Sequence, residues 1–139
     1  MTAPIAMQSE DPQVLRASLE QRVAFIVDEA RRQGASASEV GVSQSTGLSV
    51  GVRKGEVETV EFNRDQGFAI TLYVGQRKGS VSTSDTSDEA IRKAVETALV
   101  IARHASEDPN AGLADATLMA QQIPDLDLFH PWDISAEAA

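Results

Sequence analysis

The sequence contains no cysteine and only two histidines, His104 and His130, among its 139 residues. Without cysteine there is no disulfide framework and no thiolate zinc site. Helical zinc motifs place two histidines three or four residues apart with carboxylates nearby, and the two histidines here have no such spacing. We therefore interpret both as structural or surface residues, and we expect no metal ligand in this chain.

Long apolar runs and targeting signals are also missing. No apolar run approaches the roughly 18 residues that a membrane-spanning helix needs. The first residues, MTAPIAMQSEDPQ, lack the basic region and following apolar run of a signal peptide. We therefore expect no membrane contact and a cytoplasmic location, which the lack of cysteine also suits.

Basic charge is scarce, with 12 Lys and Arg residues against 21 Asp and Glu residues, for a net charge of −9. Most of this imbalance lies at the end of the chain, because residues 106–139 carry seven acidic residues and no Lys or Arg. A nucleic-acid-binding surface needs a basic patch. The charge distribution therefore argues against a nucleic-acid partner, and the simplest interpretation of residues 106–139 is a solvated acidic segment.

The usual catalytic and cofactor motifs are absent as well. The sequence has no phosphate-binding loop, no dinucleotide fingerprint and no nucleophile elbow. The serine-rich stretch SVSTSDTSD is typical of a polar edge strand that leads into a helix cap. We therefore assign no catalytic, cofactor-binding or metal-binding residue.

Helical spacing predicts a first amphipathic helix from about Asp11 to Gly34. Asp11 can cap its first turn, Pro12 suits the first helical position, and Gly34 can end the helix. Its expected buried stripe consists of Leu15, Leu19, Val23, Ile26 and Ala30.

From Glu39 onwards the apolar residues alternate with a period of two, which predicts five short strands in meander order. They cover residues 40–42, 48–53, 57–62, 68–74 and 77–85, and the expected turns lie at 45–47, 54–55, 64–67 and 75–76. The parity slips between Val57 and Val60, which indicates a β-bulge near Glu58 or Thr59.

A second amphipathic helix should follow, with Thr86 as its cap, Glu89 completing a capping box, and an end near His104. The whole pattern predicts an α+β domain with two layers, in which a mainly antiparallel sheet carries both helices on one face.

Three regions follow from this pattern. Residues 1–10 should be a disordered N-terminus, and residues 11–105 should form the α+β domain. Residues 106–139 should form an acidic strap, extended apart from a short helix starting near Leu113 or Ala114. Because the strap contains isolated apolar residues, we expect it to lie across a surface and to lead to a C-terminal domain that this sequence does not contain.

Five short stretches, STGLSV, GEVE, VEFN, RKGS and PDLDLFHP, occur in this order between Glu39 and Pro131. Together they resemble the N-terminal domain of the TldD/PmbA family, and specifically its PmbA (TldE) branch. The resemblance implies a cytoplasmic heteromeric metalloprotease that processes unfolded peptides. It also implies that zinc belongs to the TldD-type partner, through a His–Glu–x–x–x–His motif, and this sequence has no such motif.

We therefore expect a non-catalytic subunit domain that contacts a TldD-type subunit and an unfolded peptide substrate. The candidate contact residues flank the second expected hairpin turn and are Arg53, Glu58, Glu61 and Arg64. Charged residues on strands also protect a sheet edge from aggregation, which is the competing interpretation of the glutamates. Two other functions stay open, a free-standing peptide-binding adaptor and a purely structural scaffold.

Overall fold

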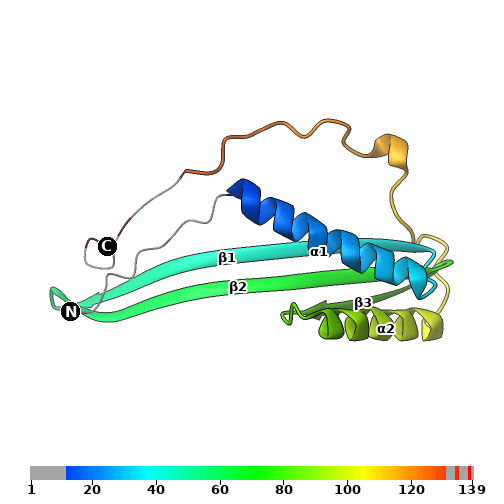
Figure 1. The fold of residues 1–139 in the computed structure, drawn as a ribbon, viewed down its shortest axis with the longest axis horizontal. Coiled ribbons are helices and arrows are strands. Elements are labelled where there is room, and N and C mark those ends of the chain that lie inside the picture. The colour runs from blue at the N-terminus through cyan, green and yellow to red at the C-terminus, as the bar shows by residue number, and fades with distance from the viewer. Residues whose placement is uncertain (1–11, 131–133, 135–137, 139) are drawn as a thin grey trace.

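A computed structural model describes residues 12–130, 134 and 138 of the chain. Helix α1 (Pro12–Arg32) comes first, followed by strands β1 (Ala37–Arg53), β2 (Glu56–Val74) and β3 (Arg77–Thr83), and then by helix α2 (Asp88–His104). The strands form one antiparallel sheet in the order β1-β2-β3. Figure 1 shows that β1 and β2 form a long hairpin, which projects well beyond the end of β3 and beyond α2.

The hydrophobic core lies between the two helices and one face of the sheet. β2 contributes Phe68, Ile70 and Leu72 to this core, which alternate along the strand and so point to the same side. Their partners Val42 and Val40 on β1 and Val81 on β3 pack against the same cluster. The helices contribute the remaining buried members, which are Ile26, Ala30, Ile91, Ala94, Val95, Ala98 and Leu99. The expected α+β domain with an antiparallel sheet and two helices is therefore confirmed.

The expected number of strands was wrong, because the structure has three strands and not five. Residues 45–47 and 64–67 look like turns in the sequence, yet they face each other in one continuous ladder. Ser45 pairs with Asp65, Thr46 with Arg64 and Gly47 with Asn63. This part of the hairpin is largely exposed, so its polar residues reflect solvent contact and not a change of chain direction.

The turn at Lys54 and Gly55 and the bulge that follows it agree with the sequence pattern. Lys54 and Gly55 have φ angles of 55° and 82°, as a two-residue hairpin turn of type I′ requires. Gly51 pairs with Thr59 and Val52 pairs with Val57, so Glu58 is the extra residue of a β-bulge. The expected bulge near Glu58 or Thr59 is therefore confirmed.

The cap of α2 lies one residue later than the sequence predicted. The Ser87 hydroxyl accepts a hydrogen bond from the Ala90 amide at 3.3 Å, so Ser87 is the cap and not Thr86. The Ser87 amide in turn donates to the Asp85 carboxylate at 2.8 Å. This backbone hydrogen bond lowers the pKa of Asp85, because it stabilises the ionised form. Asp85 and Ser87 together therefore fix the start of α2.

Replacing Ser87 by alanine should lower the free energy of unfolding by about 1 kcal/mol, because an amide in the first turn of α2 loses its acceptor. Thr86→Ala is the matched control and should leave the stability nearly unchanged. Urea denaturation of both variants measures the difference. A larger loss for Thr86→Ala than for Ser87→Ala would contradict this assignment of the cap.

Beyond α2 the described part of the chain has little regular structure. The expected short helix near Leu113 or Ala114 is a single 3₁₀ turn, Ala116–Leu118. Residues 119–130 are exposed and contain no helix or strand, so the expected contact of the strap with another surface is not seen in its described part. Residues 1–10, Asp11 and Trp132 lie outside the described residues.

Candidate interaction surface on the β1–β2 hairpin

The β1–β2 hairpin has different neighbours on the two sides of the position where β3 ends. β3 pairs with β2 from Phe68 to Val74. Among the residues that the structure describes, the rest of β2, from Glu56 to Gly67, therefore pairs with β1 alone. Every residue of β2 from Glu56 to Asp65 is exposed. No layer formed by the described residues covers this two-stranded ribbon, which is unusual because an isolated hairpin has only marginal stability in water.

One side of this ribbon is apolar. Alternation from the core residue Phe68 places Phe62 and Val60 on the side that faces the helices. The bulge at Glu58 restores the parity, so Val57 lies opposite Val52 on that same side. We call this surface the apolar face; its members are Leu48, Val50, Val52, Val57, Val60 and Phe62. The exposed fractions of Phe62, Val60, Val57 and Val52 are 46%, 46%, 57% and 61%.

The other side of the ribbon is polar, and we call it the polar face. Arg53 and Glu58 form an ion pair there, with 3.1 Å between Nη1 and Oε1, and both side chains are mostly exposed. Glu61 lies across from Ser49 on the same side. Such an exposed pair contributes little to stability, so it helps to set the charge of the surface more than to hold the hairpin together.

The four contact residues predicted from the sequence do not form one cluster. The structure brings Arg53 and Glu58 together at the tip, and Glu61 shares their face. Arg64 pairs with Thr46 in the ladder and, by alternation, points to the side of the apolar face. These positions neither support nor exclude a contact role, which stays a prediction.

Sequence reasoning missed the apolar face. Leu48 and Val50 alternate with small or polar residues, as the half-buried residues of a strand do, but they are not members of the core cluster. The signal that reveals the difference is the pair of polar stretches, 44–46 and 64–66, that face each other across the ladder. They separate the buried apolar residues of the hairpin from its exposed ones.

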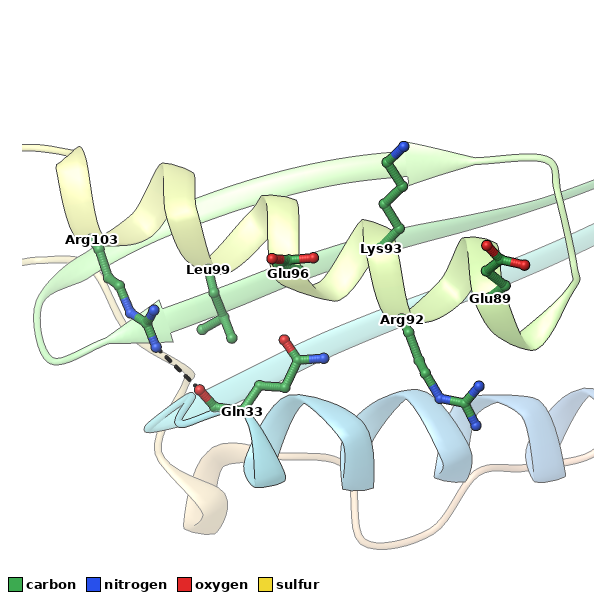
Figure 2. Close-up of a pocket in the computed structure, with 7 residues that line it drawn as sticks. All are labelled: Gln33, Glu89, Arg92, Lys93, Glu96, Leu99 and Arg103. Atoms are coloured by element: carbon green, nitrogen blue, oxygen red, sulfur yellow. Dashed lines mark hydrogen bonds between the residues drawn. The ribbon is translucent and has the colours of Figure 1, made fainter.

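A second candidate is the groove of about 630 Å³ that Figure 2 shows between α1 and α2. Two of the residues that line this groove connect α2 to α1 or to the residue that follows α1. Arg103 donates to the Gln33 carbonyl at 3.1 Å, and the Arg92 guanidinium lies 5.4 Å from the Phe25 ring centroid. The other lining residues are Glu89, Lys93, Glu96 and Leu99. The groove contains no histidine, serine or threonine, and we interpret it as the seam between the two helices.

The described residues do not fit a zinc site. Across residues 12–130, 134 and 138, no three or more His, Asp or Glu side chains gather closely enough to hold a metal ion. Nδ1 of His104 lies 2.8 Å from the Val100 carbonyl of its own helix, and His130 is exposed without a cluster around it.

In the same part of the chain, no helix is long and apolar enough to cross a membrane.

A family profile and two curated relatives that match this chain carry the same family name. Residues 38–102 match the sequence profile of the PmbA/TldA metallopeptidase domain 1. The chain is 50% identical over 121 residues to the metalloprotease PmbA homolog of Haemophilus influenzae, covering 87% of this chain and 27% of that protein. It is 49% identical over 124 residues to metalloprotease PmbA of Escherichia coli O157:H7, covering 89% and 27%. The chain thus spans about a quarter of the length of these curated relatives.

Two solved structures share the fold. A putative modulator of DNA gyrase from Bacteroides thetaiotaomicron superimposes with a TM-score of 0.69 at 22% identity, covering 76% of this chain and 24% of that one. TldE from Thermococcus kodakarensis gives 0.56 at 17% identity, covering 63% and 20%. At this level of identity the likeness establishes the fold alone.

Proposed function

This chain belongs to the PmbA/TldD metallopeptidase family, and on that basis we propose that it serves as a non-catalytic docking domain. Its partner is a TldD-type zinc subunit, and the assembly degrades unfolded peptides in the cytoplasm. The zinc ion, its ligands and the bond cleavage belong to the partner, and this domain supplies a surface for assembly.

The observation that carries this proposal is the apolar face of the hairpin. Four of its members, Val52, Val57, Val60 and Phe62, are between 46% and 61% exposed. They lie on a ribbon that β3 and α2 do not reach, as Figure 1 shows. A contiguous exposed apolar patch bounded by polar residues marks a surface that meets another molecule. A projecting element of this kind suits docking better than catalysis.

A second candidate function, the free-standing peptide-binding adaptor, draws on the open edges of the same ribbon. Within the described residues, β1 pairs only with β2, and residues 56–67 of β2 pair only with β1. Such edges accept an extended peptide through main-chain hydrogen bonds, which tolerate many sequences. Peptide binding by this chain without any protease subunit would favour the adaptor.

Two of the predicted contact residues, Arg53 and Arg64, allow a mutational test of whether the hairpin contributes to assembly. Replacing Arg53 and Arg64 together by alanine should weaken assembly or peptide turnover by about threefold to tenfold, since charges at the rim of an interface contribute modestly. Lys78→Ala combined with Arg16→Ala removes the same charge away from the hairpin and is the control. Titration of the zinc subunit at two salt concentrations measures the effect. Unchanged affinity and turnover would remove these two residues from the contact surface.

A further inference from the structure

The chain exposes a second apolar surface besides the apolar face of the hairpin. It lies in residues 123–129, which we call the C-terminal segment. The exposed fractions of Ile123, Leu126, Leu128 and Phe129 are 86%, 66%, 81% and 54%. The free energy of the chain falls when two exposed apolar surfaces bury each other away from water.

The C-terminal segment has the pattern of a strand. Asp125, Leu126, Asp127 and Leu128 alternate between acidic and apolar residues, so a strand would place both leucines on one face. In the structure Asp127 instead has a φ of 49°, and its amide donates to the Asp125 carboxylate at 2.9 Å. Outside glycine this left-handed conformation is uncommon, although aspartate adopts it more often than most residues. The strand therefore requires Asp127 to leave this turn.

The segment can reach the hairpin. The Asp108 amide donates to the Gln76 carbonyl at 2.9 Å, which anchors the chain at the end of the sheet where β1 begins. The chain from Asp108 to Ile123 spans up to about 50 Å when extended, whereas β1 covers about 36 Å from Ala37 to Leu48. In the view of Figure 1 this part of the chain runs on the β1 side, in the same direction as β1.

Charge distinguishes between the two open edges. A strand beside β2 would place Asp125 and Asp127 next to Glu61 and Asp65, which lie on the polar face of the ribbon by alternation. Like charges opposed across strands are destabilising. A strand beside β1 meets Ser49, Gly51 and the Arg53 side chain on that face instead. The β1 edge therefore fits an acidic strand better.

We propose that the C-terminal segment adds to the outer edge of β1 as a parallel strand. Leu126 and Leu128 then extend the apolar face, and Asp125 and Asp127 lie on the polar face toward Arg53. The segment acts as an intramolecular latch, which any partner that adds a strand to the β1 edge has to displace. This inference does not rest on the proposed function, because it concerns the chain by itself.

The absence of native cysteine makes disulfide trapping a clean test. Asp127→Cys is combined with Ser49→Cys or Ser45→Cys on β1, and with Glu61→Cys on β2 as the control. Ser49 and Glu61 pair directly in the ladder, but a strand beside β1 lies about 10 Å from β2. That distance exceeds the roughly 7 Å between Cα atoms that a disulfide spans.

We expect a monomeric disulfide with Ser49→Cys or Ser45→Cys, little with Glu61→Cys, and a yield independent of protein concentration. Adding Leu126→Ser and Leu128→Ser should lower that yield about tenfold, because the apolar contact is lost. Equal trapping with Glu61→Cys, or a yield insensitive to the leucines, would show random collision and overturn the latch. Disulfide-linked dimers would assign the surface to a second copy, and no trapping would also overturn it.

Discussion

Replacing Gly79 by alanine should lower the free energy of unfolding by about 3 kcal/mol, the largest loss that we expect from one methyl group in this chain. A Cβ at this position would lie 2.1 Å from the Ala98 carbonyl oxygen and 2.6 Å from the Ala102 amide nitrogen. Both are backbone atoms of α2, so no side-chain rotation relieves the clash. β3 or α2 has to move, and the buried residues Val95 and Leu99 lose contacts with them.

Gly41→Ala is the matched control for this substitution. Gly41 also lies in a strand, but its Cβ would meet only the Ala69 Cβ at 4.0 Å, which is an ordinary contact. Its stability should stay within about 0.5 kcal/mol of the original chain. Chemical denaturation monitored by circular dichroism compares the two. Equal stability of both variants would contradict the close approach of α2 to β3.

Placing aspartates on the apolar face should abolish docking to a TldD-type zinc subunit. Val60 and Phe62 are each 46% exposed and lie beyond the core, so Val60→Asp with Phe62→Asp should leave the fold intact. In a docked complex the two carboxylates would be buried without partners, which is costly. We expect the dissociation constant to rise at least about 100-fold, the scale of a central hot spot.

The control places the same two charges on the polar face, as Ser43→Asp with Asn63→Asp, whose partners across the ladder are Gly67 and Gly47. These positions alternate with the apolar ones, so the net charge changes equally while the apolar face is preserved. The control should bind within about threefold of the original chain. Isothermal titration calorimetry measures both variants. Equal loss of binding in the two would assign docking to net charge or to another surface.

The sequence predicted the parts of the fold that local rules determine. α1 is helical from the first described residue, Pro12, α2 ends at His104, and the turn at Lys54 and Gly55 and the bulge at Glu58 are where the pattern placed them. Each of these depends on residues close in sequence. The buried positions of α2 also follow from its spacing, because a helix that packs on a sheet buries one stripe.

Strand length was not predictable in the same way. Residues 45–47 and 64–67 carry turn-like polar residues, and only their pairing across the ladder shows that both strands continue through them. This pairing is a long-range property. The apolar face depends on this pairing too, since Leu48 and Val50 differ from Val40 and Val42, which pack against the core, only in what covers them. The cap at Ser87 rather than Thr86 is a smaller error of one residue, which is common at helix ends.

The measurement that tests the docking function most directly is size-exclusion chromatography of this chain with a purified TldD-type zinc subunit, followed by a peptidase assay of the fractions. We predict one shared peak whose peptidase activity is lost on zinc chelation, and no activity in the chain alone. Elution in two separate peaks, or cleavage of peptides by the chain without the zinc subunit, would contradict the account.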